Sequence, residues 1–499
     1  MFPAPLLAAL LAAGPAPAAG APESPDVHSE DGRPPNVVFI MCDDLGWGDL
    51  GCFGQEIIRT PRLDALAAEG ATLTAHYSGF PVCAPARCSL MTGKHAGRSY
   101  IRGNGYPKFR VKDPDRGLFP GQNPIPAEAV TVAELFQQRG YATAAAGKWG
   151  LGWEGSSGDP TKQGFDRFFG YVCQWHAHNH FPRFLWDLTP DLARRVPYPG
   201  NDRTLHGETY SQDEFFRVAD EFVTAHQDEP FFLYLPLVTT HLSLQVPEDE
   251  PSLAEYRRTI EEEPYKHTAY LKHPTPRAAY AAMVTRIDRQ VGELLDRLDE
   301  LGLTGNTLVV FTSDNGPVYD RLGGGDSEYF NSAGGFRGRK GSVYEGGIRA
   351  PLIVRMPGTV PAGLTSDRPT YFADWLPTLA DLTGGGLPEA VAGEIDGVSF
   401  APTLRGESQP APEFLYWEFP AYGGQQAVRV GDWKAVRTGL SKVKPGEPIA
   451  TELYNLADDP AETTDLADAR PEKLAELTAV MEREHEPSEL FPMRALDRE

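Results

Sequence analysis

The hydrophobic positions along the chain follow two patterns, one typical of buried strands and one typical of amphipathic helices. Residues 37–41 (VVFIM) form a continuous apolar run that ends abruptly at Asp43-Asp44 and a glycine-rich loop. An apolar run without alternation is expected of a parallel strand covered on both faces. Residues 307–313 (TLVVFTS) repeat this pattern, so we predict a second buried strand that ends at Asp314-Asn315.

Helical patterns separate the predicted strands. A helix is predicted over 60–70 (TPRLDALAAEG), with Thr60 as N-cap and Gly70 as the stop, and residues 71–77 (ATLTAHY) form the strand that follows. Apolar residues at helical spacing across 283–298 predict a long helix before the strand at 307.

A second helix and strand precede the first candidate basic residue. The helix is predicted over 131–140, where Thr131 and Glu134 form a capping box, and the strand 141–147 then delivers Lys148. Strands that alternate with helices indicate an α/β domain, with a large and mainly parallel sheet between layers of helices.

The pattern changes after about residue 405. Residues 414–419 (FLYWEF), 426–437 (QAVRVGDWKAVR) and 451–456 (TELYNL) predict short antiparallel strands, and residues 472–483 predict a helix. We therefore expect a large α/β domain over 36–404 and a small C-terminal α+β domain with an antiparallel sheet over 405–499.

The N-terminus and the net charge indicate where the protein works and what it does not bind. Residues 1–20 are short, apolar and end in small residues, so we expect a signal peptide, a disordered linker over 21–35, and a secreted or periplasmic protein. No apolar run is long enough to span a membrane. The chain carries 69 acidic and 46 basic residues, a net charge of −23, which argues against nucleic acid as its main partner.

Acidic residues follow both buried strands, and ligands bind at the carboxyl ends of strands in open α/β sheets. The pairs Asp43-Asp44 and Asp314-Asn315 offer only oxygen ligands, which favour Ca²⁺, or Mg²⁺, over zinc. One such pair alone would be better explained as a turn cap, but two pairs after two buried strands favour a metal site.

Cys83 has unusual surroundings among five cysteines, too few for a disulfide scaffold. It begins a predicted helix that Gly93 closes, so free backbone N–H groups face it, and Arg87 lies one turn further on. A buried structural thiol is the plainer alternative, and a thiolate nucleophile would need a base beside it.

The segment 83–93 (CAPARCSLMTG) resembles the signature C-x-P-[SA]-R-x-x-x-x-T-G of the type I, formylglycine-dependent sulfatases. Further segments across nearly the whole mature chain are similar to the same family, among them "DDLGWGDLGCFG", "FTSDNG" and "ELYNLADDP". The resemblance implies an alkaline-phosphatase-like fold, a sulfuric ester hydrolase of arylsulfatase type, and conversion of Cys83 to formylglycine (3-oxoalanine). A formylglycine-generating or maturase enzyme would then be a partner during biogenesis.

The resemblance also implies the roles of individual residues. One Ca²⁺ would be held by Asp43, Asp44, Asp314, Asn315 and the formylglycine from Cys83. The implied catalytic residues are Cys83, Arg87, Lys148, His241, Asp314 and Lys340. The formylglycine attacks sulfur, Arg87 steadies its hydrate and Asp314 assists its deprotonation. Lys148 and Lys340 bind sulfate oxygens, and His241 protonates the leaving alcohol.

Residue 150 departs from the family pattern, because Gly150 stands where many members carry a histidine that contacts the formylglycine. The nearby segment 173–186 (CQWHAHNHFPRFLW) has histidines at alternate positions, which would share one face of a strand. We expect them to line a substrate pocket rather than to bind zinc, with His178 reaching into the space at Gly150. The predicted substrate-binding residues are Trp175, His176, His178 and Arg183.

Three functions are compatible with these residues. A sulfatase acting on a sulfated carbohydrate is favoured, because the aromatic and polar residues of 173–186 suit a sugar. A phosphate or phosphonate ester hydrolase of the same superfamily is an alternative. A catalytically inactive carbohydrate-binding relative is another, disfavoured because the implied catalytic residues are all present.

Overall fold

The computed structural model describes residues 32–111, 119–265, 270–319, 322–444 and 446–497. The predicted signal peptide, and the predicted linker up to residue 31, lie outside the described residues. No helix among the described residues is long and apolar enough to cross a membrane.

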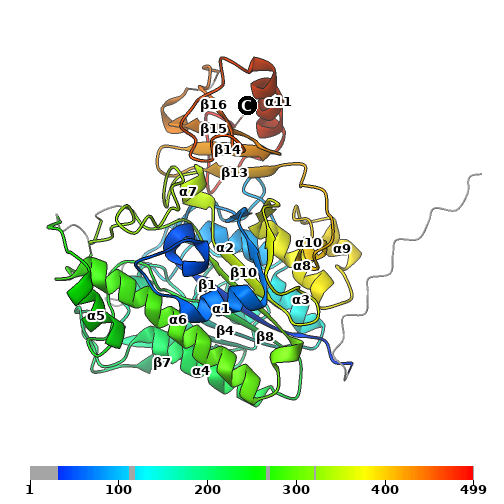
Figure 1. Cartoon of the computed structure of the whole chain (residues 1–499). Helices are drawn as coiled ribbons and strands as arrows, with labels where there is room; N and C mark the ends of the chain where they lie inside the picture. Colours follow the sequence, from blue (N-terminus) through cyan, green and yellow to red (C-terminus); the bar gives the residue numbers. More distant parts are fainter. Residues whose placement is uncertain (1–31, 112–118, 266–269, 320–321, 445, 498–499) are drawn as a thin grey trace, which may run out of the picture.

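A ten-stranded sheet forms the centre of the larger domain (Figure 1). Its five middle strands run parallel, four pairs outside them are antiparallel and one edge pair is parallel, so the predicted mainly parallel α/β sheet is confirmed. The strand order is β11 (Leu364–Ser366), β2 (Ala71–Leu73), β10 (Leu352–Arg355), β9 (Thr307–Ser313), β1 (Asn36–Cys42), β8 (Phe231–Pro236), β4 (Ala142–Lys148), β5 (Arg167–Tyr171), β6 (Phe184–Thr189) and β7 (Leu192–Pro197).

The central strand β1 is apolar from Val37 to Cys42 because its two faces belong to two separate cores. Val37, Phe39 and Met41 pack into one core, whereas Val38 and Ile40 pack into the other. The first core includes residues of α2 (Cys83–Thr92), α3 (Val132–Gln138), α8 (Trp375–Leu382) and α10 (Ala401–Leu404). The second includes residues of α1 (Pro61–Glu69), α4 (Ser211–Ala225), α5 (Pro251–Thr259) and α6 (Pro276–Glu300).

Local details of the helix starts differ from one predicted helix to the next. The Thr131–Glu134 capping box is confirmed, since each side chain accepts a hydrogen bond from the other residue's backbone N–H. Thr60 precedes α1 but does not cap it. Its hydroxyl instead accepts from the backbone N–H of Gly51 and donates to Asp64, because the loop after β1 packs against this helix start.

The segment 71–77 is not one strand, as the pattern predicted, but two. β2 lies in the main sheet, whereas β3 (His76–Tyr77) pairs with β12 (Thr370–Tyr371) in a separate two-stranded sheet. A turn at Thr74 and Ala75 breaks the strand. The turn redirects the chain toward α2. The hydrophobic periodicity of a single sequence does not predict this change of direction.

The C-terminal region forms the predicted antiparallel sheet, which stands above the main sheet in Figure 1. Its strands in order are β13 (Leu415–Phe419), β14 (Gln425–Val430), β15 (Trp433–Thr438) and β16 (Glu452–Asn455). Helix α11 (Pro471–Arg483) packs on β14 and β15 and buries Leu477 and Met481. The boundary between residues 404 and 405 stays a prediction.

A buried ion-pair cluster joins this small sheet to the larger domain. The ammonium group of Lys434, on β15, lies 2.9 Å from carboxylate oxygens of both Glu345 and Glu462, and all three side chains are fully buried. The larger domain also contains the short helix α9 (Glu389–Ala392), which is not part of this cluster. Glu345 begins α7 (Glu345–Ile348), which follows the loop that carries Lys340. The cluster therefore ties the C-terminal sheet to the segment beside Lys340.

Removing the central cation of this cluster should strongly destabilise the fold. We expect Lys434→Met to lower the free energy of unfolding by about 3–5 kcal/mol, because two buried carboxylates lose their partner. Burial already raises the pKa of Glu462 to about 7, despite Lys434, so in the variant this carboxyl protonates readily. A pKa raised in the folded state means that the folded protein gains stability as pH falls.

The loss of unfolding free energy in Lys434→Met should therefore be smaller at about pH 5.5 than at about pH 8, as measured by urea unfolding. The matched control is Lys442→Met, an exposed lysine of the same subdomain, which should change stability by no more than about 0.5 kcal/mol. Equal losses for the two lysine variants would contradict the structural role of the cluster.

Candidate active site

The chemically reactive side chains gather at the carboxyl edge of the central strands. Asp43 and Asp44 follow β1, Lys148 ends β4, and Asp314 and Asn315 follow β9. His241 lies in the loop after β8, and Cys83 is the first residue of α2. The predicted convergence at this edge is what the structure has, because neighbouring parallel strands end at the same side of a sheet.

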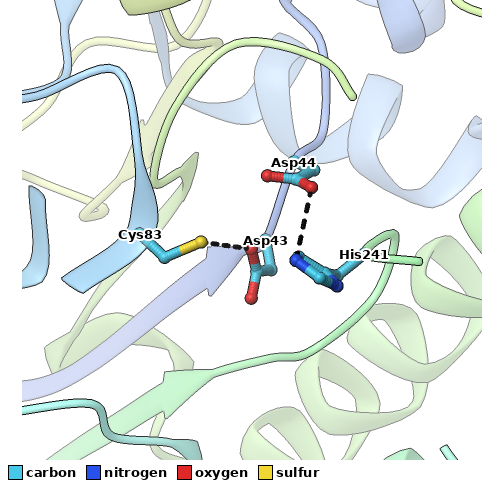
Figure 2. Close-up of side chains that lie close together, drawn as sticks. All are labelled: Asp43, Asp44, Cys83 and His241. Atoms are coloured by element: carbon cyan, nitrogen blue, oxygen red, sulfur yellow. Dashed lines mark hydrogen bonds and ion pairs between the residues drawn. The ribbon is translucent and has the colours of Figure 1, made fainter. Parts of the chain in front are cut away.

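Asp43 lies at the centre of the group (Figure 2). The thiol of Cys83 donates to Asp43 Oδ1 over 3.2 Å. The ammonium of Lys148 contacts Asp43 Oδ2. Arg87 Nη2 is 3.4 Å from the same carboxylate oxygen. All four side chains are buried, so these charges have each other as partners instead of water.

Two further contacts complete the charge balance. Lys340 Nζ lies 2.7 Å from Asp44 Oδ1 and 3.4 Å from the sulfur of Cys83. Arg87 Nη2 donates to Asp314 Oδ2 over 2.7 Å. Three carboxylates thus face three cations, which is how a buried site can hold so many ionised groups.

The surroundings of Cys83 keep its thiol protonated. Burial and the negative charge of Asp43 raise the pKa of Cys83 to about 12, although Lys148 and Lys340 act in the opposite direction. A thiolate is the reactive form of cysteine, so a thiol with this pKa is a poor nucleophile at neutral pH. The geometry therefore disfavours the plain thiolate mechanism considered from the sequence.

The three carboxyl groups differ in their proton affinity. Burial alone would raise the pKa of Asp43, but Lys148, His241 and Arg87 hold it well below its usual range. Burial raises the pKa of Asp44, and burial with the charge of Asp43 raises that of Asp314 to about 6. Asp314 is therefore the group best placed to exchange a proton near neutral pH.

Asp314 and Asn315, which carry oxygen atoms suited to a hard cation, are both hydrogen-bonded to Asp44. Asp314 Oδ1 accepts a hydrogen bond from the backbone N–H of Asp44, and Asn315 Nδ2 donates to Asp44 Oδ1. Asn315 Oδ1 is buried without a hydrogen-bond partner among the described residues, as expected of an atom that serves as a ligand. Ligand atoms of Asp43, Asp44, Cys83 and His241 also lie within 4.8 Å of one another.

The histidine segment differs from its prediction. Residues His176–His178 form a short 3₁₀-helix, not a strand, so the three histidines do not share a face. His176 is buried between the rings of Tyr171 and Phe184, and the ring of His180 bonds to the carbonyl of His241. Packing of this segment against the sheet, which periodicity does not encode, sends the side chains in different directions.

His178 lies beside His241 and not, as predicted, in the space at Gly150. Its ring stacks on that of His241, with centroids 4.9 Å apart. Trp175, 51 % exposed, lies next to His178, whereas Arg183 forms an ion pair with Asp202 at the surface. Of the four predicted substrate-binding residues, His178 packs on His241 and Trp175 packs on His178.

The space at Gly150 is occupied by a residue that the sequence reasoning missed. A Cβ atom at Gly150 would lie 2.2 Å from Nε2 of Gln174, and the backbone of Gly150 has a φ of +86°. His178 therefore does not enter this space. Gln174 directly precedes Trp175 in the segment already singled out, but only its position in the fold reveals the contact with Gly150.

Restoring a histidine at position 150 should be costly for two separable reasons. We expect Gly150→His to destabilise the protein through its left-handed φ, by roughly 1–2 kcal/mol, and further through overlap with Gln174. Gly140→His is the matched control, because Gly140 has a φ of +78° and open space around it.

The difference in unfolding free energy between Gly150→His and Gly140→His, measured in urea, reports the overlap with Gln174. Adding Gln174→Gly to Gly150→His should recover part of the lost stability. Equal destabilisation of the two histidine variants would show that Gln174 does not restrict position 150.

Comparison with known proteins agrees with this geometry. The family model described as Sulfatase matches residues 35–385, and that described as N-sulphoglucosamine sulphohydrolase, C-terminal, matches residues 335–488. Steryl-sulfatase of Mus musculus is 32% identical over 496 residues, which cover 86% of this chain and 72% of that protein. Arylsulfatase A of Homo sapiens is 32% identical over 489 residues, with coverages of 89% and 86%.

A solved structure has the same architecture. The structure of Ps i-CgsB in complex with k-i-k-neocarrahexaose has a TM-score of 0.70 and 27% sequence identity, and the match covers 94% of this chain and 95% of that chain. The family match spans well over half of the sequence and includes every residue of the charged cluster. The chain therefore belongs to the sulfatase family and is a sulfuric ester hydrolase.

Proposed function

We propose that the protein hydrolyses a sulfate monoester to an alcohol and inorganic sulfate, with formylglycine derived from Cys83 as nucleophile and one bound Ca²⁺. The observation that carries this proposal is the position of Cys83, at the start of α2 and in contact with Asp43 and Lys340. Once converted, this residue would supply a hydrated aldehyde. One of its hydroxyls would attack sulfur as the bond from sulfur to the alcohol oxygen breaks, and the other would then lose its proton, so that the aldehyde re-forms and inorganic sulfate leaves. The raised pKa of the unconverted thiol supports conversion over direct thiolate attack.

The cations around Cys83 are suited to a sulfate group. Lys340 Nζ is 3.4 Å from the sulfur of Cys83, and Lys148 approaches from the side of Asp43. Fixed positive charges in a buried site stabilise charge that spreads over the sulfate oxygens in the transition state. Because both ammonium groups are held by carboxylates, they need little reorganisation when the substrate binds.

Proton transfer falls to two residues. His241 donates through Nδ1 to the carbonyl of Leu242, which leaves Nε2 directed toward Asp44, 3.7 Å away, as the atom that delivers a proton to the leaving alcohol. Burial and Lys340 lower the pKa of His241, so the negative charge of a bound sulfate is needed to favour its protonated form. Asp314, whose carboxylate is held by the Arg87 guanidinium, accepts the proton of the nucleophilic hydroxyl.

The residues that would hold the metal are Asp43, Asp44, Asp314 and Asn315, together with the converted Cys83. Their carboxylate and amide oxygens suit Ca²⁺, and Mg²⁺ is the alternative. When bound, the ion supplies a Lewis acid that neutralises charge on sulfate oxygens. Arg87 would hold Asp314 in place, because its guanidinium donates two hydrogen bonds to Asp314 Oδ2.

The substrate proposed is a carbohydrate sulfate. The solved structure of Ps i-CgsB was obtained with k-i-k-neocarrahexaose, a complex that supports but does not identify a sugar substrate for this chain. The exposed ring of Trp175 packs on His178, which stacks on His241, and such an exposed aromatic ring is of the kind that packs on sugar rings. We further propose that the protein is secreted or periplasmic and is matured by a formylglycine-generating or maturase enzyme.

Activity should depend on Cys83 and on its conversion. We expect Cys83→Ala to lower kcat for p-nitrophenyl sulfate by roughly 10⁴-fold or more, since the nucleophile is lost. Cys88→Ala is the control, because Cys88 is a buried free cysteine of the same helix that lies outside the charged cluster.

Mass spectrometry of the peptide that carries residue 83 should find the aldehyde form in protein from a competent host. Faster release of phosphate from p-nitrophenyl phosphate than of sulfate would favour the phosphate ester hydrolase instead. Full activity of an unconverted thiol would contradict the proposal.

Removal of the metal should abolish turnover and reduce stability. We expect EDTA treatment to eliminate sulfate release and Ca²⁺ to restore it, because oxygen ligands dominate the predicted set. Ca²⁺ at one hundred times its Kd should also add about 2.7 kcal/mol to the free energy of unfolding. An unchanged Tm with and without Ca²⁺, together with full activity in EDTA, would rule out the metal site.

A further inference from the structure

A cavity of about 480 Å³ lies between the larger domain and the C-terminal subdomain, beside the residue that precedes Cys83. Its size falls in the range of about 300–1,000 Å³ typical of small-molecule sites. Its wall comes from three segments distant in sequence: the start of α2 with the loop after it, the loop after β13, and the C-terminal segment. The lining residues that matter below are Val82, Asn104, Tyr106, Asn123, Phe419 and Tyr422.

Two of these residues connect the cavity to the nucleophile. Val82 is the neighbour of Cys83 in the chain, and Asn104 Oδ1 accepts a hydrogen bond from the backbone N–H of Ala84, at the start of α2. The cavity thus opens beside the helix end at which Cys83 lies.

Tyr422 connects the cavity to the other side of the nucleophile. A Cβ atom at Gly341 would lie 2.4 Å from the ring of Tyr422, so this ring rests directly on the backbone next to Lys340. Lys340 in turn contacts the sulfur of Cys83. A group that occupied the cavity would therefore lie between the start of α2 and the Lys340 loop.

The unusual backbone conformation of Tyr422 is accompanied by contacts that fix its ring. Its φ of +50° is uncommon for a bulky residue, and such conformations persist where the surroundings hold them. The hydroxyl of Tyr319 donates to the hydroxyl of Tyr422, and the ring of Phe419 packs edge-on against it. Despite these contacts Tyr422 is 61 % exposed, as is Leu490, which also lines the cavity.

The chemistry of the wall distinguishes between classes of substrate. None of the described residues that line the cavity carries a charge. The aromatic rings offer faces for an apolar ring surface, and the amides of Asn104 and Asn123 offer hydrogen bonds at the rim. A carboxylate or a second sulfate placed here would lose water without gaining a cation, which is unfavourable.

We propose that this cavity binds the ring of the alcohol that carries the sulfate, and that it selects uncharged rings over rings that bear a carboxylate or a second sulfate. The inference rests on the proposed function and narrows its substrate. A neutral sugar and an aryl group share the required chemistry, an uncharged ring with an apolar face. Tyr422 is then a specificity-determining residue, supplied by the C-terminal subdomain to a site in the larger domain.

The test measures binding apart from turnover, by calorimetry in the Cys83→Ala background. The ligands are the 2-, 3- and 4-monosulfates of methyl galactopyranoside, the same monosulfates of methyl galacturonoside, p-nitrophenyl sulfate and ethyl sulfate. The matched sugars differ only in the carboxylate, so we expect the best galacturonoside to bind at least about tenfold more weakly than the best galactoside. Tighter binding of p-nitrophenyl sulfate than of every galactoside would identify the aryl ring as the preferred occupant.

Variants of the wall separate ring recognition from sulfate recognition. We expect Tyr422→Ala to weaken binding of the preferred ring ligand about tenfold and to leave ethyl sulfate, which has no ring, unchanged. Asn123→Lys adds a cation to the wall and should shift preference toward the galacturonosides by about tenfold. Val398→Ala is the control, because Val398 is an exposed apolar residue that does not line the cavity.

Galacturonosides that bind as well as galactosides would overturn the inference, as would an equal effect of Tyr422→Ala on ethyl sulfate. If instead the proposed function is wrong, the protein should still bind the ring ligands selectively, but the converted wild-type protein should release no sulfate. The two failures are thereby distinguishable.

Discussion

The site depends on one electrostatic constraint: three buried carboxylates must be matched by three buried cations. Asp43 is the central residue of this cluster, because it contacts Cys83, Lys148 and Arg87. In an interior of low dielectric, each of these charges is tolerable only while its partners stay in place. The same constraint prepares the site for catalysis, since cations fixed by carboxylates are already oriented when an anionic substrate arrives.

The architecture meets this constraint with elements that are distant in sequence. Parallel strands β1, β4 and β9 end together and deliver Asp43, Lys148 and Asp314 to one edge. The helix start at Cys83 and the loop of Lys340 come from outside the sheet. The buried Lys434 cluster links that loop to the C-terminal sheet, so the small domain supports one of the cations of the active site.

The same small domain also contributes to the surface that would meet the substrate. Tyr422 leaves the C-terminal sheet in a left-handed conformation and rests on Gly341, next to Lys340. A glycine is required at 341, because any Cβ would displace the ring. The C-terminal subdomain therefore contacts the same loop that supplies Lys340 to the charged cluster.

The sequence by itself predicted a mainly parallel sheet, a C-terminal antiparallel sheet and the acidic pairs of the charged cluster, because local signals mark them: apolar runs that end in acidic residues, and a capping box at Thr131. Lys340 and His241 followed only from the family resemblance, which the motif around Cys83 carries. Tertiary structure alone decided the break at Thr74-Ala75, the separate directions of the three histidines, and the occupation of the space at Gly150 by Gln174. These features depend on packing between segments far apart in the chain, and periodicity reports only the neighbours of a residue along one strand or helix.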